Sequence, residues 1–337
     1  MNDQLNDFLR KMHRTPSHIS TSAYDTAWAA WHLPAAMDWL LEAQHPDGSW
    51  GAELEYHHDR VISTLAAINA IAARSTNASA LQQAERGVAY LEKAISRLGE
   101  DVYETVGFEL LLPGLVGLAL AQGLKVQRVE EQMAPQLKLF REKMALVPPQ
   151  AIYSPQFPVA FSLEFLSFEQ LDRSAVHQLR ASNGSIHNSP AATAYVDAAL
   201  GGAQGRDYLE TLMARYGGAM PAFAPFELFE SAWALHHLSL GTQLTGLPAA
   251  RPFVDQLARL WNPRGLSFSS NLSFADLDDT ALAFRILHLF GEEADPAGLE
   301  FFETPEHFRC YPLERNISID VHIHILHALR EARDFPR

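Results

Sequence analysis

Apolar side chains recur every three or four residues along most of the chain, which is the period of an amphipathic helix. The stretches that show this spacing are 22–31, 34–44, 60–75, 79–98, 129–147, 225–240, 252–261, 279–290 and 318–334. The segment "ISIDVHIHI" (317–325) alternates as a strand would, but it continues into "LHALREAR", which favours a buried helix. Gly and Pro cluster between the stretches. The pattern therefore predicts an all-α chain of short helices.

Length and charge narrow the class of protein. The 337 residues are enough for two domains or one large one. A net charge of −14 argues against a nucleic-acid partner, although bound metal ions could still attract an anionic substrate. No apolar run approaches the roughly 18 residues of a membrane span, and the N-terminus lacks the apolar core of a secretory signal. The single Cys310 fits a reducing compartment. We expect a cytoplasmic protein without a membrane span.

Three aspartates crowd the head of one apolar stretch. Asp276, Asp278 and Asp279 stand in "FADLDDTALAFRIL" (274–287), beside large apolar residues. Carboxylates that become half buried repel each other and lose hydration. An N-cap for the helix that follows is one interpretation of this cluster.

Several segments together resemble the class II terpene cyclases, and in particular the copalyl-diphosphate-synthase-like diterpene cyclases. They follow one another in the order of that family. They are "SAYDTAW" (22–28), "DGSWG" (47–51), "VGFELLLPGL" (106–115), "SPAATAY" (189–195), "PFELFESAW" (225–233), "DLDDTALAFRIL" (276–287) and "ERNISIDVHIHILHAL" (314–329). "DLDD" is similar to the acid motif Asp-x-Asp-Asp of the family. Any one of these motifs is weak evidence for the resemblance, whereas the whole set in the family's order is specific to it.

The resemblance implies two α-barrel domains, named β and γ in that family. Carried onto this chain, the β domain comprises 1–34 and 222–337, and the inserted γ domain comprises 35–221. At roughly 17 residues for a helix and its loop, 222–337 holds about seven helices, whereas the family's β barrel has about twelve. We therefore expect an incomplete β barrel that closes differently or is completed by a second cyclase subunit. A homo-oligomer is left open.

The resemblance also implies a chemistry for the aspartates. Cyclisation of this class begins with protonation of an alkene, so a carboxylic acid must be kept protonated by burial and by neighbouring anions. Asp278 is the candidate proton donor, and Asp276 and Asp279 would position it and relay protons. Ser318 and His322, one helical turn apart, match the segment that supports the acid in the family. A histidine on an apolar helix is more commonly an ordinary core residue.

Two further groups of site residues are implied by the resemblance. Mg²⁺, which would hold the diphosphate of the substrate, is expected at the acidic segment that contains Glu100, Asp101 and Glu104. A solvated acidic loop is the alternative for that segment. Ring faces that stabilise carbocations are expected from aromatic residues, although each could simply be core. The aromatic candidates are Tyr24, Trp233, Phe229 and Phe274.

The function that the resemblance implies is that of an isomerase of the diterpene cyclase type. It would cyclise geranylgeranyl diphosphate to a bicyclic product and retain the diphosphate. Farnesyl diphosphate is the rival substrate, and a non-catalytic subunit of a split cyclase is the rival function. A zinc-dependent prenyltransferase-like barrel is a third hypothesis. The positions of the family's terminating base are Phe161 and Ala222, which cannot take up a proton. His187 is a substitute suggested by spacing alone.

Overall fold

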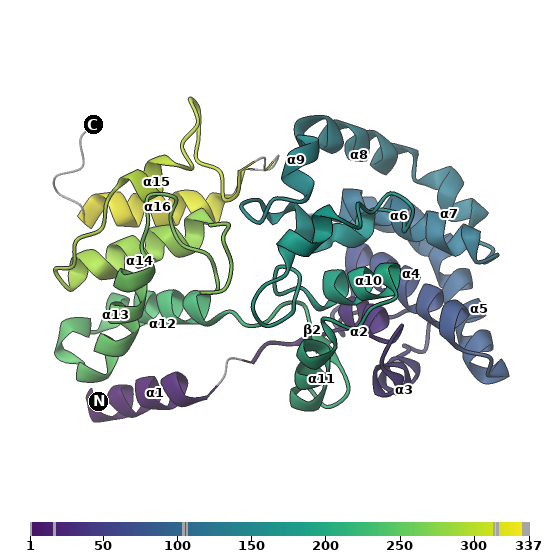
Figure 1. The fold of residues 1–337 in the computed structure, drawn as a ribbon, viewed down its shortest axis with the longest axis horizontal. Helices are drawn as coiled ribbons and strands as arrows, with labels where there is room; N and C mark the ends of the chain where they lie inside the picture. The colour runs from purple at the N-terminus through teal and green to yellow at the C-terminus, as the bar shows by residue number, and fades with distance from the viewer. Residues whose placement is uncertain are drawn as a thin grey trace. The chain divides into compact units, whose positions relative to one another are not determined.

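Helices form most of the protein (Figure 1). The computed structural model describes residues 2–15, 18–102, 105, 107–312, 314 and 317–331. The strands in this part of the chain are the two-residue segments β1 (Thr21–Ser22) and β2 (Met220–Pro221), which pair antiparallel. The prediction of an all-α fold is confirmed.

Contacts divide the chain into two compact units. The first comprises 1–18, 155–158 and 225–337, and the second comprises 19–154 and 159–224. Residues 19–34, which we assigned to the β domain, group here with the second unit. The domain boundaries of the sequence analysis stay a prediction.

The first unit is built around one central helix, α14. Its helices are α1 (Asn2–Arg14), α12 (Glu227–Gly241), η4 (Leu244–Gly246), η5 (Pro248–Ala250), α13 (Arg251–Leu260), α14 (Leu277–Leu289), α15 (Ala297–Glu300) and α16 (Ile319–Glu331). Figure 1 draws α14 between α12 and α16, and α14 packs on both and on α13. Its inner positions, including Leu282, Phe284 and Ile286, are at most 1% exposed. This packing fixes the start of α14 within the apolar core.

The segment 317–325 illustrates how tertiary context decides between strand and helix. Its alternation of apolar and polar residues is typical of a strand, but the structure forms α16 from Ile319 onward. Val321, Ile325 and Ala328 are almost fully buried and lie on one side of this helix. The predicted helix is confirmed, because burying that side satisfies the apolar spacing of the longer segment.

The second unit contains the remaining elements. They are α2 (Ala23–Ala29), α3 (Pro34–Glu42), α4 (His57–Arg74), α5 (Ala78–Ala94), η1 (Ile95–Glu100), α6 (Phe108–Ala121), α7 (Gln127–Gln132), α8 (Ala134–Leu146), α9 (Pro149–Ile152), η2 (Pro158–Phe165), η3 (Ala175–Leu179), α10 (Pro190–Leu200) and α11 (Arg206–Arg215). The stretch 129–147 forms two helices rather than one. The break falls at Met133, because Pro135 starts a helix readily but cannot donate a backbone hydrogen bond within one.

The core of the second unit forms around α2 and α4. Every residue of α2 is buried, and α4 packs on α2, α5 and α6. The turn after α3 joins it to its neighbours: the Trp50 indole N–H donates to Leu40 O at 2.7 Å. The Gln44 amide donates to Gln83 O of α5 at 2.9 Å. One Gly-containing turn therefore fixes α3 against α5 through two side chains.

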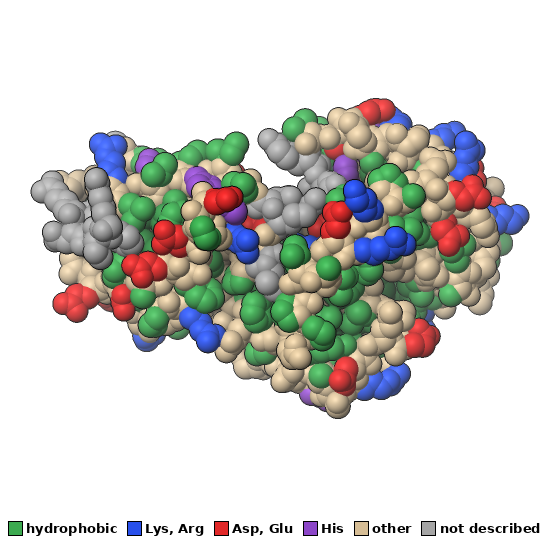
Figure 2. Space-filling view, turned by 90° about the horizontal axis from the view of Figure 1, so that it is seen from above, with side chains coloured by type: hydrophobic (Ala, Val, Ile, Leu, Met, Phe, Trp, Pro, Cys, Tyr) green, Lys and Arg blue, Asp and Glu red, His purple; other side chains and the backbone are tan. Residues whose placement is uncertain are grey.

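The surface of the second unit carries charges of both signs. Figure 2 shows acidic and basic side chains next to each other on the face of this unit that it presents. Pairs such as Arg206 with Glu210, both about half exposed, contribute at most about 1 kcal/mol each. The stability of the unit therefore rests on its apolar core. None of the described helices in either unit is both long and apolar enough to cross a membrane.

Candidate active site

The aspartate cluster lies at the first turn of α14, in the first unit. Asp276 has the extended backbone of an N-cap, and its Oδ1 accepts from the Asp279 amide at 2.8 Å. Its own amide donates to Leu266 O at 2.9 Å, which ties the loop before the helix to the cap. The N-cap interpretation is therefore correct for Asp276. It leaves the side chains of Asp278 and Asp279 available for other contacts.

Asp276 and Asp279 form a buried pair of carboxyl groups. They are 3% and 2% exposed, and Asp276 Oδ2 has no hydrogen-bond partner in the part of the chain that the structure describes. Burial, followed by the nearby Asp279 charge, raises the pKa of Asp276 well above its usual range. Burial also raises the pKa of Asp279 to about 7. Burial therefore favours the protonated forms of this pair.

Helix α12 supplies the wall next to this pair. The Trp233 indole N–H donates to Asp279 Oδ1 at 3.0 Å, which lowers the pKa of Asp279 against the effect of burial. Phe229, one turn earlier on α12, lies with its ring centroid 5.1 Å from that of Trp233. Two of the predicted aromatic residues therefore lie together on α12, and one of them, Trp233, contacts Asp279. Their role in binding a substrate stays a prediction.

Asp278 is the most accessible of the three carboxyl groups. Its side chain is 24% exposed, and its Oδ1 lies 2.7 Å from His324 Nδ1 of α16. Its Oδ2 lies 3.5 Å from Cys310 Sγ, in the loop before α16. Burial and the neighbouring carboxylates raise the pKa of Cys310, so the thiol keeps its proton and can donate weakly. Each oxygen of Asp278 thus faces a potential donor.

The histidine beside Asp278 is His324 and not the predicted His322. His322 Nδ1 lies 2.6 Å from Ser318 O, and His322 Nε2 accepts from the Phe308 amide at 3.3 Å. Ser318 Oγ accepts from the Val321 amide at 3.4 Å, close to the start of α16. The expected contact of Ser318 and His322 with Asp278 is therefore corrected to His324.

The helical period explains this correction. Side chains two apart on a helix point in nearly opposite directions, so only one of His322 and His324 can face α14. His324 lies three residues after Val321 and four before Ala328, both fully buried against α14. Apolar spacing in the sequence does not identify His324, because Ile319, Ile323 and Leu326 have the same spacing and lie on an exposed side of α16. Cys310 carried no signal either, because it lies in an irregular loop.

The imidazole of His324 sits among other rings. Its centroid is 4.9 Å from the Trp233 ring at an interplanar angle of 89°, and 5.9 Å from that of His236. Burial, together with the Arg285 charge, lowers the pKa of His236 to about 4, so His236 is neutral at pH 7. The Arg285 guanidinium donates to Ser239 Oγ at 2.5 Å. Packing from α12 therefore restricts the orientation of His324.

The other predicted aromatic residues lie elsewhere. Phe274 is 2% exposed and packs on Phe268, with ring centroids 5.7 Å apart. Tyr24 belongs to the second unit, where its hydroxyl donates to Glu164 Oε1 at 2.8 Å. Both are core residues of their own units, and their predicted role in substrate binding is untested.

The acidic segment proposed for Mg²⁺ lies in the second unit and is only partly described. Asp101 Oδ2 accepts from the amide and the ring of His58, at 2.8 and 2.7 Å. Glu100 is exposed and pairs with Arg97 at 2.9 Å. Glu104 lies outside the described residues. Within those described, no group of three or more His, Cys, Asp or Glu side chains is arranged to hold a metal ion.

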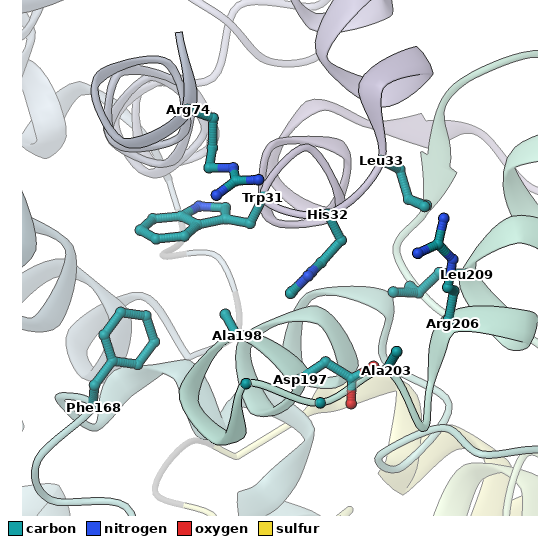
Figure 3. Close-up of a pocket in the computed structure, with 12 residues that line it drawn as sticks. Trp31, His32, Leu33, Arg74, Phe168, Asp197, Ala198, Ala203, Arg206 and Leu209 are labelled. Carbon is teal, nitrogen blue, oxygen red and sulfur yellow. The ribbon is translucent and has the colours of Figure 1, made fainter.

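A cavity of about 450 Å³ opens in the second unit (Figure 3). Trp31 and Arg74 lie next to each other on one side of it, and His32 points toward its centre. Asp197, at its base, accepts from Arg180 at 2.5 Å and from the Gly205 amide at 2.9 Å. The carboxylate of this cavity is therefore already paired with a guanidinium and a backbone amide.

Comparison with known proteins relates the chain to one group of enzymes. The syn-copalyl diphosphate synthase of Oryza sativa subsp. japonica is 32% identical over 314 residues, which cover 89% of this chain and 40% of that protein. The type B diterpene cyclase of Mycobacterium tuberculosis is 32% identical over 334 residues, which cover 93% of this chain and 66% of that protein. No family model matches the chain. The chain thus spans about 40% of the length of the plant relative.

Solved structures agree with the sequence relatives. The ent-copalyl diphosphate synthase of Arabidopsis thaliana matches with a TM-score of 0.83 and 25% identity, over 99% of this chain and 51% of that one. The ent-copalyl diphosphate synthase of Streptomyces platensis matches in fold with a TM-score of 0.72 and 24% identity, over 97% of this chain and 68% of that one. The chain is therefore a class II diterpene cyclase-like protein.

Proposed function

We propose that this chain provides the acid of a class II diterpene cyclase, and that Asp278 delivers the proton. The observation that carries the proposal is the arrangement of three carboxyl groups at the start of α14. Asp278 is the accessible one, with a side chain 24% exposed, while Asp276 and Asp279 are buried behind it, where burial raises their pKa values and favours their protonated forms. The carboxyl group that would donate the proton and the two buried carboxyl groups next to it therefore lie on one helical turn.

The proposed step transfers one proton from the Asp278 carboxyl to a terminal alkene carbon of the substrate. The alkene electron pair forms the new C–H bond, and the resulting carbocation is consumed as further alkenes close rings. Loss of one proton ends the reaction, and the diphosphate is not expelled. The chain lacks the Asp-Asp-x-x-Asp motif that ionises a diphosphate, since "DDTAL" has no third aspartate.

His324 and Cys310 would make the release of that proton less costly. As Asp278 becomes a carboxylate, a His324 N–H at 2.7 Å can donate to its Oδ1. A hydrogen bond to a charged group contributes roughly 1.5–3 kcal/mol, so it favours the ionised product of the step over the neutral acid. The Cys310 thiol at 3.5 Å from Oδ2 adds a weaker donor.

Geranylgeranyl diphosphate is the substrate that we propose. The Arabidopsis structure is a complex with an aza analogue of a geranylgeranyl thiolodiphosphate, so this relative binds an analogue of a diphosphate with a twenty-carbon chain. This supports a substrate of the same length here. Farnesyl diphosphate is the alternative. Mg²⁺ stays part of the proposal. The described Glu100 and Asp101 pair with Arg97 and His58, so they do not by themselves form a metal site.

A second candidate function is that of one subunit in a split cyclase. Ile319, Ile323 and Leu326 lie on one side of α16 at helical spacing and are 72%, 46% and 65% exposed. An apolar helix face of this kind favours contact with further polypeptide. Under this alternative the chain is inactive until a second polypeptide covers α16.

One experiment separates the two. The purified chain is incubated with each prenyl diphosphate, with and without Mg²⁺, and the products are dephosphorylated and identified by mass spectrometry. A cyclic alcohol from the chain alone supports the proposed cyclase. Linear alcohols alone would refute it for the isolated chain. Activity that appears only when a separately expressed helical fragment is added would instead establish the split cyclase.

A further inference from the structure

Trp233 on α12 contacts two groups that lie next to Asp278. Its indole N–H donates to Asp279 Oδ1 at 3.0 Å, and Asp279 follows Asp278 directly in the first turn of α14. Its ring centroid lies 4.9 Å from that of His324 in a T-shaped arrangement, and His324 Nδ1 is 2.7 Å from Asp278 Oδ1. One side chain of α12 therefore reaches a neighbour of the proposed acid on α14 and another on α16.

The Trp233 ring is restricted by its own helix. Phe229 lies one turn earlier and His237 one turn later, with ring centroids 5.1 and 5.9 Å from that of Trp233. Both rings are closer to parallel than to perpendicular with the indole, at interplanar angles of 31° and 25°. His237 Nδ1 is also 2.7 Å from Trp233 O, which fixes the later ring on the helix. The indole N–H is therefore directed at Asp279 from a ring that packs against neighbours on α12 as well as against His324.

The two contacts act on the surroundings of Asp278 in different ways. The hydrogen bond from the indole favours one orientation of the Asp279 carboxyl group, because Oδ1 must stay within reach of the donor. The packing of Trp233 against His324 limits rotation of the imidazole, so that its Nδ1 stays directed at Asp278. Both effects need Trp233 in its place, and neither needs it to touch the substrate.

We propose that Trp233 is a positioning residue, which holds the Asp279 carboxyl group and the His324 imidazole in the places from which they act on Asp278. This role rests on the proposed function of Asp278 as the acid and extends the site to α12. It differs from stabilisation of a carbocation, which uses the face of an aromatic ring and can be supplied by phenylalanine. The positioning role requires the indole N–H.

Trp233→Phe separates the two roles, because phenylalanine keeps an aromatic ring and lacks the N–H. Positioning predicts that kcat for geranylgeranyl diphosphate falls roughly 10-fold while KM changes by less than about 2-fold. Trp261→Phe is the matched control. It also removes an indole donor in the first unit, but the acceptor of that donor, at 3.2 Å, is Asp295 O. The control should keep kcat within about 2-fold of the parent.

Asp278→Asn is measured in the same assay to keep two failures apart. If Trp233→Phe has the kcat of the parent while Asp278→Asn is inactive, the positioning role is overturned and the proposed acid stands. If Asp278→Asn still cyclises the substrate, the proposed function fails and the positioning role fails with it.

An NMR measurement that does not depend on turnover tests the contact between Trp233 and Asp279. Burial raises the pKa of Asp279 to about 7, and the Trp233 donor lowers it against the effect of burial. The indole N–H signal of Trp233, assigned by its absence from Trp233→Phe, should therefore shift as pH rises through about 7, whereas that of Trp261 should not. The other titratable groups that face the aspartate cluster are Asp276, Asp278, His324, Cys310 and Tyr311. Asp279→Asn should remove most of the shift and so assign it to Asp279. A Trp233 signal that does not move between about pH 5 and 9 would refute the contact and the inference.

Discussion

Replacement of His324 by Leu should slow cyclisation far more than the same change at His322. His324 is the group whose nitrogen lies 2.7 Å from Asp278, and its hydrogen bond strengthens when Asp278 becomes a carboxylate. The loss of a bond worth roughly 1.5–3 kcal/mol in the transition state corresponds to a roughly 10- to 150-fold lower turnover. Turnover of geranylgeranyl diphosphate at saturation is the assay.

His322→Leu is the matched control. It removes contacts to Ser318 O and to the Phe308 amide, which hold the loop before α16 and do not reach Asp278. It should reduce stability by about 1 kcal/mol and change turnover by less than about 3-fold. In an Asp278→Asn background, His324→Leu should cost no further activity, because the two side chains act as one pair. A more severe loss from His322→Leu than from His324→Leu would refute this reasoning.

The remaining predictions concern stability. The pKa of Asp279 rises on folding to about 7, so the folded state binds more protons than the unfolded state between about pH 4 and 7. Its contribution to the free energy of unfolding therefore falls as pH rises through that range, and Asp279→Asn should flatten the decline measured by urea titration. Gly87→Ala places a Cβ 2.7 Å from Ile68 Cγ2 and 3.0 Å from Trp50 Cζ3. It should cost roughly 1–3 kcal/mol of unfolding free energy. Gly99→Ala, whose Cβ meets nothing within 4 Å, should cost under about 0.5 kcal/mol. Equal losses would contradict the packing around Trp50.

The helices could be predicted from apolar spacing where they bury one side against a neighbour. The stretch that forms α5 shows this, since its buried residues recur every three or four positions, at Ala80, Ala84, Gly87, Tyr90, Leu91 and Ala94. At 129–147 the apolar spacing predicted one helix, whereas the structure has two, α7 and α8, because Pro135 divides the segment. The spacing also placed the helix start at 279, whereas Asp276 caps a helix that begins at Leu277.

The site was predictable to the extent that it lies on one helical turn. Asp276, Asp278 and Asp279 are adjacent in sequence, so their proximity follows from the chain itself. The partners of Asp278 come from the loop and helix of 310–324, and resemblance to a family motif placed the histidine two positions too early. Which histidine faces Asp278 is set by how α16 packs on α14. Cys310 contacts Asp278 from an irregular loop, which has no periodic pattern in the sequence.

The turnover of an Asp278→Asn variant tests the proposed function most directly. Asparagine keeps the shape of the side chain but has no transferable proton, so turnover should fall by at least the roughly 100- to 10,000-fold attributed to a positioned general acid. Circular dichroism and thermal unfolding should be close to those of the parent, because Asp278 is the most accessible of the three carboxyl groups. A folded Asp278→Asn protein that still cyclises geranylgeranyl diphosphate near the parent rate would show that Asp278 is not the acid.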